Sequence, residues 1–221
     1  MKLKILSFLV VFVGLGCLNK VYALGSGTSA IGNILLKNGS QLDEVLFEMP
    51  LMQDKKVKVK INGKKQKLAT DSIDCIILWN KKHPEEKHLF KAFRMEIMDL
   101  TTGAVTGVTP YTIWLCCEQM ASNASYWIEV GRPSFRGGHL RFNFNSLYSY
   151  TSKYYVLKKG SEYPSHIPEK DSDVRKWARF YFSDDSEVSC RIENGDYNVS
   201  DWGYKSIDIC RIIADYNPKR F

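Results

Sequence analysis

Residues 57–68, Val-Lys-Val-Lys-Ile-Asn-Gly-Lys-Lys-Gln-Lys-Leu, alternate apolar and charged side chains before an Asn-Gly pair and continue with lysines after it. Alternation predicts strands with one buried face, because successive side chains of a strand point to opposite sides. Asn-Gly is the strongest short hairpin signal, since both turn positions need a positive φ. The stretch therefore predicts an antiparallel hairpin in which Lys60 opposes Lys65 and Lys58 opposes Lys67.

The chain on both sides of this hairpin carries further strand patterns. A second Asn-Gly pair, at residues 38–39, predicts a hairpin between 34–37 and 45–47. The apolar run at 75–79 has the length of a strand that is buried on both faces. Further strand-like stretches lie at 89–98, 111–118, 126–130, 140–144 and 154–158. We therefore expect one β-rich domain over residues 31–159.

The pattern changes after residue 159. Residues 160–171 hold one glycine and two prolines among charged and small residues, and they predict a linker. Over residues 172–221 apolar side chains recur at helical spacing, with Gly195 and Asn217-Pro218 as helix ends. The expected fold class is α+β: a mainly antiparallel β part, either a sandwich or a partly open barrel, followed by a short C-terminal helical segment.

Residues 1–23 have the pattern of an export signal. Two lysines precede an apolar run from Ile5 to Leu18, and Val21 and Ala23 satisfy the small-residue rule for cleavage after Ala23. The run is shorter than the about 20 residues that a membrane span needs. No later stretch approaches that length, so we expect no transmembrane helix.

A lipid anchor on Cys17 is the alternative to cleavage after Ala23. Gly16 fits a lipidation signal, whereas the position three before the cysteine is Gly14, where a leucine is usual. With cleavage, residues 24–30 form a flexible leader. Both alternatives place the protein outside the cytoplasm, in the periplasm, at the cell surface or in the extracellular space.

Export into an oxidising compartment permits disulfides. Without the export segment five cysteines remain, so at least one thiol is free or pairs between molecules. Cys116 and Cys117 are neighbours that would point to opposite faces of a strand. Cys190 and Cys210 lie on separate predicted helices, and they form the expected disulfide.

The net charge of +7 is unevenly distributed. Loss of the three lysines of the export segment lowers it to +4, and seven further lysines lie between residues 55 and 67, a stretch without an acid. The rest of the chain is therefore at −3. Binders of single-stranded nucleic acid interleave cations with stacking aromatics, and no aromatic residue occurs from 53 to 77. We expect no nucleic-acid partner.

Two interpretations of these lysines remain open. Like charges opposite each other destabilise a hairpin, so one interpretation is a face that holds an anion such as a lipid phosphate or an acidic glycan. The other is protection of an exposed sheet edge against further strand pairing. Charge runs usually form solvated faces, which makes edge protection the simpler interpretation. The residues of the anion interpretation are Lys56, Lys58, Lys60, Lys65 and Lys67.

Two other stretches suggest small-ligand chemistry. Arg132 and Arg136 lie within the Gly/Pro-containing loop 131–139 and suit a carboxylate or phosphate. A hairpin loop with solvated arginines is the simpler interpretation. His83 and His88 are five residues apart with a proline between them. A helical zinc motif places its histidines four apart, so we expect a polar turn at 83–88, no metal site and no cofactor.

Four short stretches stand out at residues 32–39, 71–79, 178–185 and 212–217. Together they resemble a group of uncharacterised secreted proteins of Bacteroidetes bacteria. The resemblance implies a β-rich start with a G-x-I-x-L-x-N-G hairpin, an S-x-I-D turn into a buried strand, and a helical tail that ends in Tyr-Asn. Such relatives carry Phe-x-Asp-Cys-Pro in the tail, whereas this chain has Phe-Ser-Asp-Asp-Ser at 182–186, so no role of that cysteine is transferred.

No local motif supplies a carboxylate pair, a catalytic triad or a metal set, so no catalytic residue is assigned. The expected function is that of an exported envelope or surface protein, a non-catalytic binding or interaction module. Its expected partner is an anionic envelope lipid or glycan, or another envelope protein. The alternative is a hydrolase of cell-envelope or extracellular polysaccharide, with carboxylates brought together from distant strands, for example Glu118 and Glu129.

Overall fold

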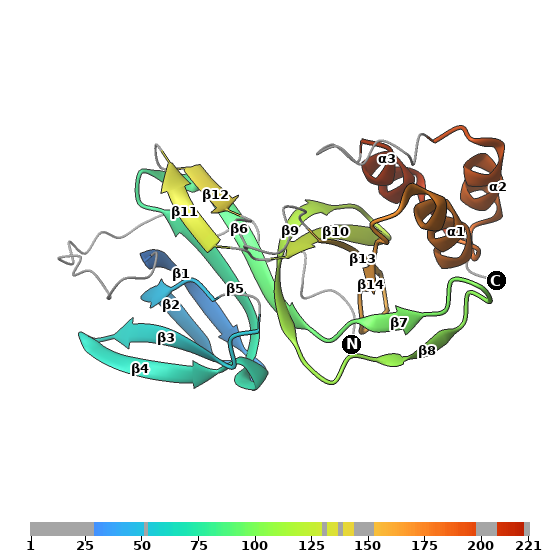
Figure 1. Ribbon diagram of the computed structural model, residues 1–221. Coiled ribbons are helices and arrows are strands. Elements are labelled where there is room, and N and C mark those ends of the chain that lie inside the picture. Colours follow the sequence, from blue (N-terminus) through green and yellow to red (C-terminus); the bar gives the residue numbers. More distant parts are fainter. Residues whose placement is uncertain are drawn as a thin grey trace.

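One open sheet organises the chain in the computed structural model, which describes residues 29–50, 53–129, 132–136, 139–143, 153–197 and 207–218 (Figure 1). The sheet has twelve strands in the order β4-β3-β2-β1-β5-β6-β9-β10-β13-β14-β7-β8, and every neighbouring pair is antiparallel except β14 and β7. A separate hairpin, β11–β12, and three short helices complete the described fold. The predicted α+β class with a mainly antiparallel sheet is confirmed, and the sheet does not close. The predicted export segment at 1–23, Ala23 and Cys17 lie outside the described residues.

The first six strands contain both predicted hairpins. The first hairpin has a longer second arm than predicted, since its strand begins at Gln41. The run at 75–79 lies in a strand as predicted, but the expectation of two buried faces is wrong. Ile76 and Leu78 are fully buried while Ile77 is 37% exposed, because only one face of the sheet is covered here. The strands are β1 (Ser29–Leu36), β2 (Gln41–Glu48), β3 (Lys56–Ile61), β4 (Lys64–Ala69), β5 (Ile73–Asn80) and β6 (His83–Phe93).

The remaining strands form the second half of the sheet and the separate hairpin. The stretch predicted as one strand at 89–98 is divided between β6 and β7. The segment predicted as a linker contains β14, which pairs with β13 and β7 and is therefore part of the sheet. The strands are β7 (Glu96–Met98), β8 (Val105–Val108), β9 (Ile113–Met120), β10 (Ala124–Glu129), β11 (Arg132–Arg136), β12 (His139–Asn143), β13 (Tyr154–Lys158) and β14 (Ser165–His166).

Three helices follow the strands, as the apolar spacing predicts: α1 (Asp171–Tyr181), α2 (Ser186–Asn194) and α3 (Ile207–Asp215). The Asp185 carboxylate caps α2 and accepts hydrogen bonds from the backbone N–H groups of Glu187 and Val188, both at 3.1 Å. Such a cap satisfies donors that have no partner inside the helix. As predicted, α2 ends at Gly195. None of the helices in the described ranges is long and apolar enough to cross a bilayer.

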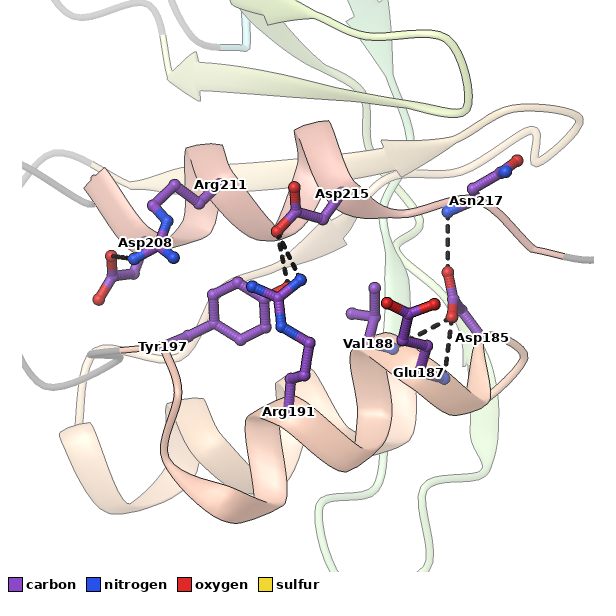
Figure 2. A network of polar contacts seen from close by, with 9 residues as sticks. All are labelled: Asp185, Glu187, Val188, Arg191, Tyr197, Asp208, Arg211, Asp215 and Asn217. Carbon is purple, nitrogen blue, oxygen red and sulfur yellow. Dashed lines mark hydrogen bonds and ion pairs between the residues drawn. The ribbon is translucent and has the colours of Figure 1, made fainter.

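A polar network joins α2 to α3 (Figure 2). The Asp215 carboxylate accepts hydrogen bonds from Arg191 at 2.9 Å and from the Tyr197 hydroxyl at 2.8 Å. The Arg191 guanidinium also lies 4.5 Å from the centre of the Tyr197 ring. At the other end of α2, the backbone N–H of Asn217 donates to Asp185 at 2.8 Å. These contacts fix the helices to one another, so they belong to the fold.

The two faces of the sheet carry different cores. On one face the strands β1–β3, β5, β6 and β9 bury Phe47, Val59, Phe90 and Trp114, and farther along Tyr126 packs against the helices. The opposite face holds a smaller core, in which adjacent residues of the same strands take part, as strand alternation requires. Its members are Phe93, Met95, Ile113, Leu115, Trp127 and Tyr155. On that opposite face, strands β3 and β4 present the lysines.

Candidate anion-binding face

The β3–β4 hairpin has the register that its sequence predicts. Lys60 is paired with Lys65 and Lys58 with Lys67. The turn residues Asn62 and Gly63 have φ values of 49° and 79°, which is the left-handed conformation that Asn-Gly adopts most readily. The predicted hairpin is confirmed down to its cross-strand pairs.

Five lysines lie on one side of this hairpin, and we call them the lysine face: Lys56, Lys58, Lys60, Lys65 and Lys67. Val57 and Val59 point to the other side and are buried in the core of the first half of the sheet, with 1% and 0% exposure. The apolar side holds the hairpin to the core. Because the valines are fixed in the core, the lysines are held on the opposite side of the hairpin.

One carboxylate lies at the border of the lysine face. Glu48 of β2 accepts a hydrogen bond from the Lys58 ammonium at 2.7 Å. This bond and the negative charge of Glu48 raise the pKa of Lys58. Lys56, Lys65 and Lys67 have no ion pair with a residue that the structure describes, so the face keeps a strong excess of positive charge. Glu48 is ten residues away on another strand, and the hairpin sequence alone gave no signal of it.

The lysines of β3 lie on an inner strand. β3 pairs with β4 on one side and with β2 on the other, through Leu46↔Lys60 and Phe47↔Val59. Charges that protect an edge lie on the edge strand itself, which here is β4. Edge protection therefore explains Lys65 and Lys67 but gives no reason for Lys60, which is paired with a strand on each side.

The two arginines predicted at a loop lie on strand β11 instead. Arg136 pairs with His139 and Arg132 with Asn143, so both belong to the separate β11–β12 hairpin. Their side chains lie outside what the structure describes. The pairing of the sheet does not connect β11–β12 to the lysine face.

A buried polar group that the sequence did not reveal lies on the opposite half of the sheet. Tyr155 donates a hydrogen bond to Glu129, and its ring lies 5.2 Å from the ring of His166. Burial raises the pKa of Glu129 and lowers that of His166 to about 4, with a contribution from the nearby Lys153 in the second case. His166 Nε2 is buried without a hydrogen-bond partner among the described residues. The only sequence signal was a carboxylate at the end of an otherwise apolar strand.

The carboxylates suggested for a hydrolase do not face each other. Glu129 is paired with Leu115, and Glu118 lies three residues farther along β9, a separation of about 10 Å along a strand. Burial raises the pKa of Glu118, and burial followed by the nearby charge of Glu118 raises the pKa of the Cys210 thiol of α3. The two glutamates therefore belong to different surroundings.

The five cysteines of the described residues are free thiols, including the expected pair Cys190 and Cys210. Cys190 lies on α2 between the buried Val188 and Ile192, and its side chain is on the exposed side of the helix. It forms no disulfide with Cys210 of α3. Burial raises the pKa of Cys117 to about 11. A thiol with a raised pKa is a poor nucleophile.

The expectation of a polar turn at 83–88 is wrong. These residues open strand β6, and the turn lies just before them, at Lys81 and Lys82. His83 contacts Glu85 at 3.2 Å, whereas burial lowers the pKa of His88. Within the described ranges no three histidine, cysteine or acidic side chains come together as metal ligands.

In comparisons with known proteins, no family model, no curated protein and no solved structure matches the chain. A functional assignment therefore depends on the residues themselves.

Proposed function

We propose that this protein is an exported, non-catalytic binding protein of the cell envelope or cell surface, and that its lysine face binds a polyanionic partner. The observation that carries the proposal is the position of Lys60 on the inner strand β3, where it is paired with Leu46 of β2 on one side and with Lys65 of β4 on the other. Opposed lysines destabilise the hairpin, and on an inner strand they do not protect an edge. A binding role gives a reason for keeping them.

The export of the protein and its relation to secreted Bacteroidetes proteins are part of the same proposal. Cleavage after Ala23 gives a mature chain that starts at Leu24, whereas lipidation keeps Cys17 at the N-terminus. The intact mass of the protein recovered from the envelope distinguishes these two forms. A mass that begins at Leu24 rejects the lipid anchor.

Removal of three charges tests the proposal. In Lys60→Gln/Lys65→Gln/Lys67→Gln the Glu48–Lys58 ion pair stays in place, and we expect the affinity for a polyanion such as heparin to fall roughly ten- to a hundredfold, at about 0.5–1 kcal/mol per lysine. The matched control is Lys37→Gln/Lys81→Gln/Lys159→Gln, three exposed lysines elsewhere. Titration calorimetry at two salt concentrations measures the affinities. Equal affinities of the two triple variants would refute the role of the lysine face.

A polysaccharide hydrolase is the second candidate, because Glu129 is a buried carboxyl group that accepts a hydrogen bond from Tyr155, and the Tyr155 ring packs against the ring of His166. A carboxyl group with a raised pKa suits general acid catalysis. The prediction of this candidate is turnover of an envelope polysaccharide that Glu129→Gln abolishes. Turnover that survives Glu129→Gln, or none in the unaltered protein, counts against it.

A further inference from the structure

The lysine face continues into a row of apolar side chains on the same side of the sheet. Residues directly opposite one another on five adjacent strands, β4-β3-β2-β1-β5, are Lys65, Lys60, Leu46, Ile31 and Trp79. Strands lie about 4.8 Å apart, so this row extends about 19 Å across the sheet. We call it the outer row; it begins with two cations and ends with three apolar residues.

The apolar part of the outer row lies on the side of the sheet that faces away from the core of Phe47, Val59 and Phe90. Ile34, Phe47 and Leu78 of the same strands are fully buried in that core. On the other side of the sheet, Leu46, Ile31 and Trp79 are half-buried. Next to them Ile77 is 37% exposed. The outward positions of an antiparallel sheet are normally polar when one face is solvated. Here the strands next to the lysines present apolar side chains instead.

A further cation lies at the tryptophan end of the row. The Lys87 ammonium of β6 lies 5.7 Å from the centre of the Trp79 ring. Lysine side chains rest their aliphatic stems on apolar surface and keep the ammonium in water. Tryptophan is enriched at the boundary between headgroups and acyl chains of bilayers. Across the sheet, the outer row and Lys87 thus place lysines on both sides of a group of apolar side chains. An anionic membrane surface offers phosphate groups to such lysines and acyl carbons to such apolar side chains.

We infer that the anionic partner of the lysine face is the headgroup layer of a lipid bilayer, with Leu46, Ile31 and Trp79 in contact with the upper acyl region; this inference rests on the proposed function. A soluble polyanionic glycan is the other source of negative charge. Its hydroxyl groups need hydrogen-bond partners when they are desolvated, and Leu46 and Ile31 offer none. Phosphate headgroups meet the lysines while acyl carbons meet the apolar residues, so a bilayer uses the whole row.

The test compares two double variants of the full chain. Ile31→Thr/Leu46→Thr removes apolar surface from the outer row but keeps β-branched or strand-forming residues. The control, Ile97→Thr/Val105→Thr, changes two apolar residues of 47% and 54% exposure at the other end of the sheet. Circular dichroism verifies that both variants fold. All proteins share one N-terminus, so differences between them report on the row.

Co-sedimentation measures binding to vesicles of phosphatidylcholine with and without phosphatidylglycerol, and calorimetry measures binding to heparin. We expect preference for the anionic vesicles and a loss of about tenfold in vesicle affinity for Ile31→Thr/Leu46→Thr alone, with heparin affinity unchanged. Equal vesicle affinity of both double variants overturns the inference. Binding to heparin without binding to vesicles overturns it and leaves the proposed function standing. Equal binding to both kinds of vesicle also overturns the inference, and heparin binding then leaves the proposed function standing. Binding to neither probe overturns both.

Discussion

The two ends of the sheet protect themselves in different ways. At one end the edge strand β4 carries two lysines of the lysine face and its neighbour β3 carries the other three. At the other end β8 carries the uncharged residues Val105–Val108. β8 is only four residues long, and its pairing with β7 shifts register between Ile97 and Met98. Short strands and irregular registers are themselves protections against further pairing. One edge of this sheet therefore manages without charge.

The difference between the two edges bears on whether the lysines serve to protect an edge. If four uncharged residues suffice at β8, edge protection does not require five lysines at the other end, and it does not require any on β3. The two hairpins also differ in how they are held. The β3–β4 hairpin packs two valines into the core, whereas the tip of β7–β8 contacts helix α1, where an added Cβ on Gly103 would lie 2.5 Å from Phe180. The charge is thus a property of one hairpin, not of the fold as a whole.

The largest expected effect is a loss of stability in acid, which should affect the part of the sheet around β13 and β14 more than the β3–β4 hairpin. The pKa of His166 is lowered to about 4 in the folded protein, chiefly by burial, and is near 6.5 in an unfolded chain. Between these values the unfolded chain binds more protons, so the free energy of unfolding falls as the pH drops through this window, by about 3 kcal/mol for this group. The lysines stay charged throughout. Urea unfolding at neutral pH and at about pH 4.5 measures the loss.

His166→Asn is the control for this prediction, since it removes the titrating ring. Its stability should fall less than that of the unaltered protein over the same pH range. Amide exchange should locate the acid-induced opening at β13 and β14 rather than at β3 and β4. An equal acid response with and without the histidine would contradict the assignment.

Two glycine substitutions compare the hairpins directly. Gly63 and Gly103 have φ values of 79° and 74°, so alanine is strained at both, at about 1 kcal/mol. Only Gly103→Ala also forces Phe180 to move, and we expect a total loss of roughly 2–4 kcal/mol there. Chemical denaturation measures both variants. Equal losses would mean that the contact between the β7–β8 tip and α1 contributes nothing.

A charge reversal on the lysine face has the smallest expected effect on stability. Lys65→Glu places opposite charges across from each other at Lys60, and we expect a gain of roughly 0.2–1 kcal/mol. The same change should weaken anion binding. Lys81→Glu, on an exposed turn, serves as the control and should change neither quantity. A destabilised Lys65→Glu variant would show that the opposed lysines are not under strain.

Much of the fold could be predicted from local patterns. The two Asn-Gly turns, the register of the lysine hairpin and the helix end at Gly195 depend on residues that are neighbours in sequence. The burial of 75–79 could not be predicted, because an apolar run does not reveal whether one or both faces of a sheet are covered. The strand at 83–88 was missed because Pro84 and the charged residues beside it suggested a turn.

In the candidate site too, some features could be predicted from local patterns and others could not. Alternation and turn chemistry assigned the lysines to one face in advance. Glu48, the outer row and the Glu129–Tyr155 pair depend on the order of strands that are distant in sequence, and no local pattern encodes that order. The position of β3 inside the sheet, which changes the interpretation of the lysines, is also a long-range property.

Lysine footprinting by acetylation and mass spectrometry tests the central claim most directly. The protein is labelled with and without phosphatidylglycerol vesicles or heparin, and the rate is compared residue by residue. We predict that Lys56, Lys60, Lys65 and Lys67 are protected several-fold while Lys37 and Lys159 react as before. Uniform protection of all lysines, or protection confined to residues outside the lysine face, would contradict the claim.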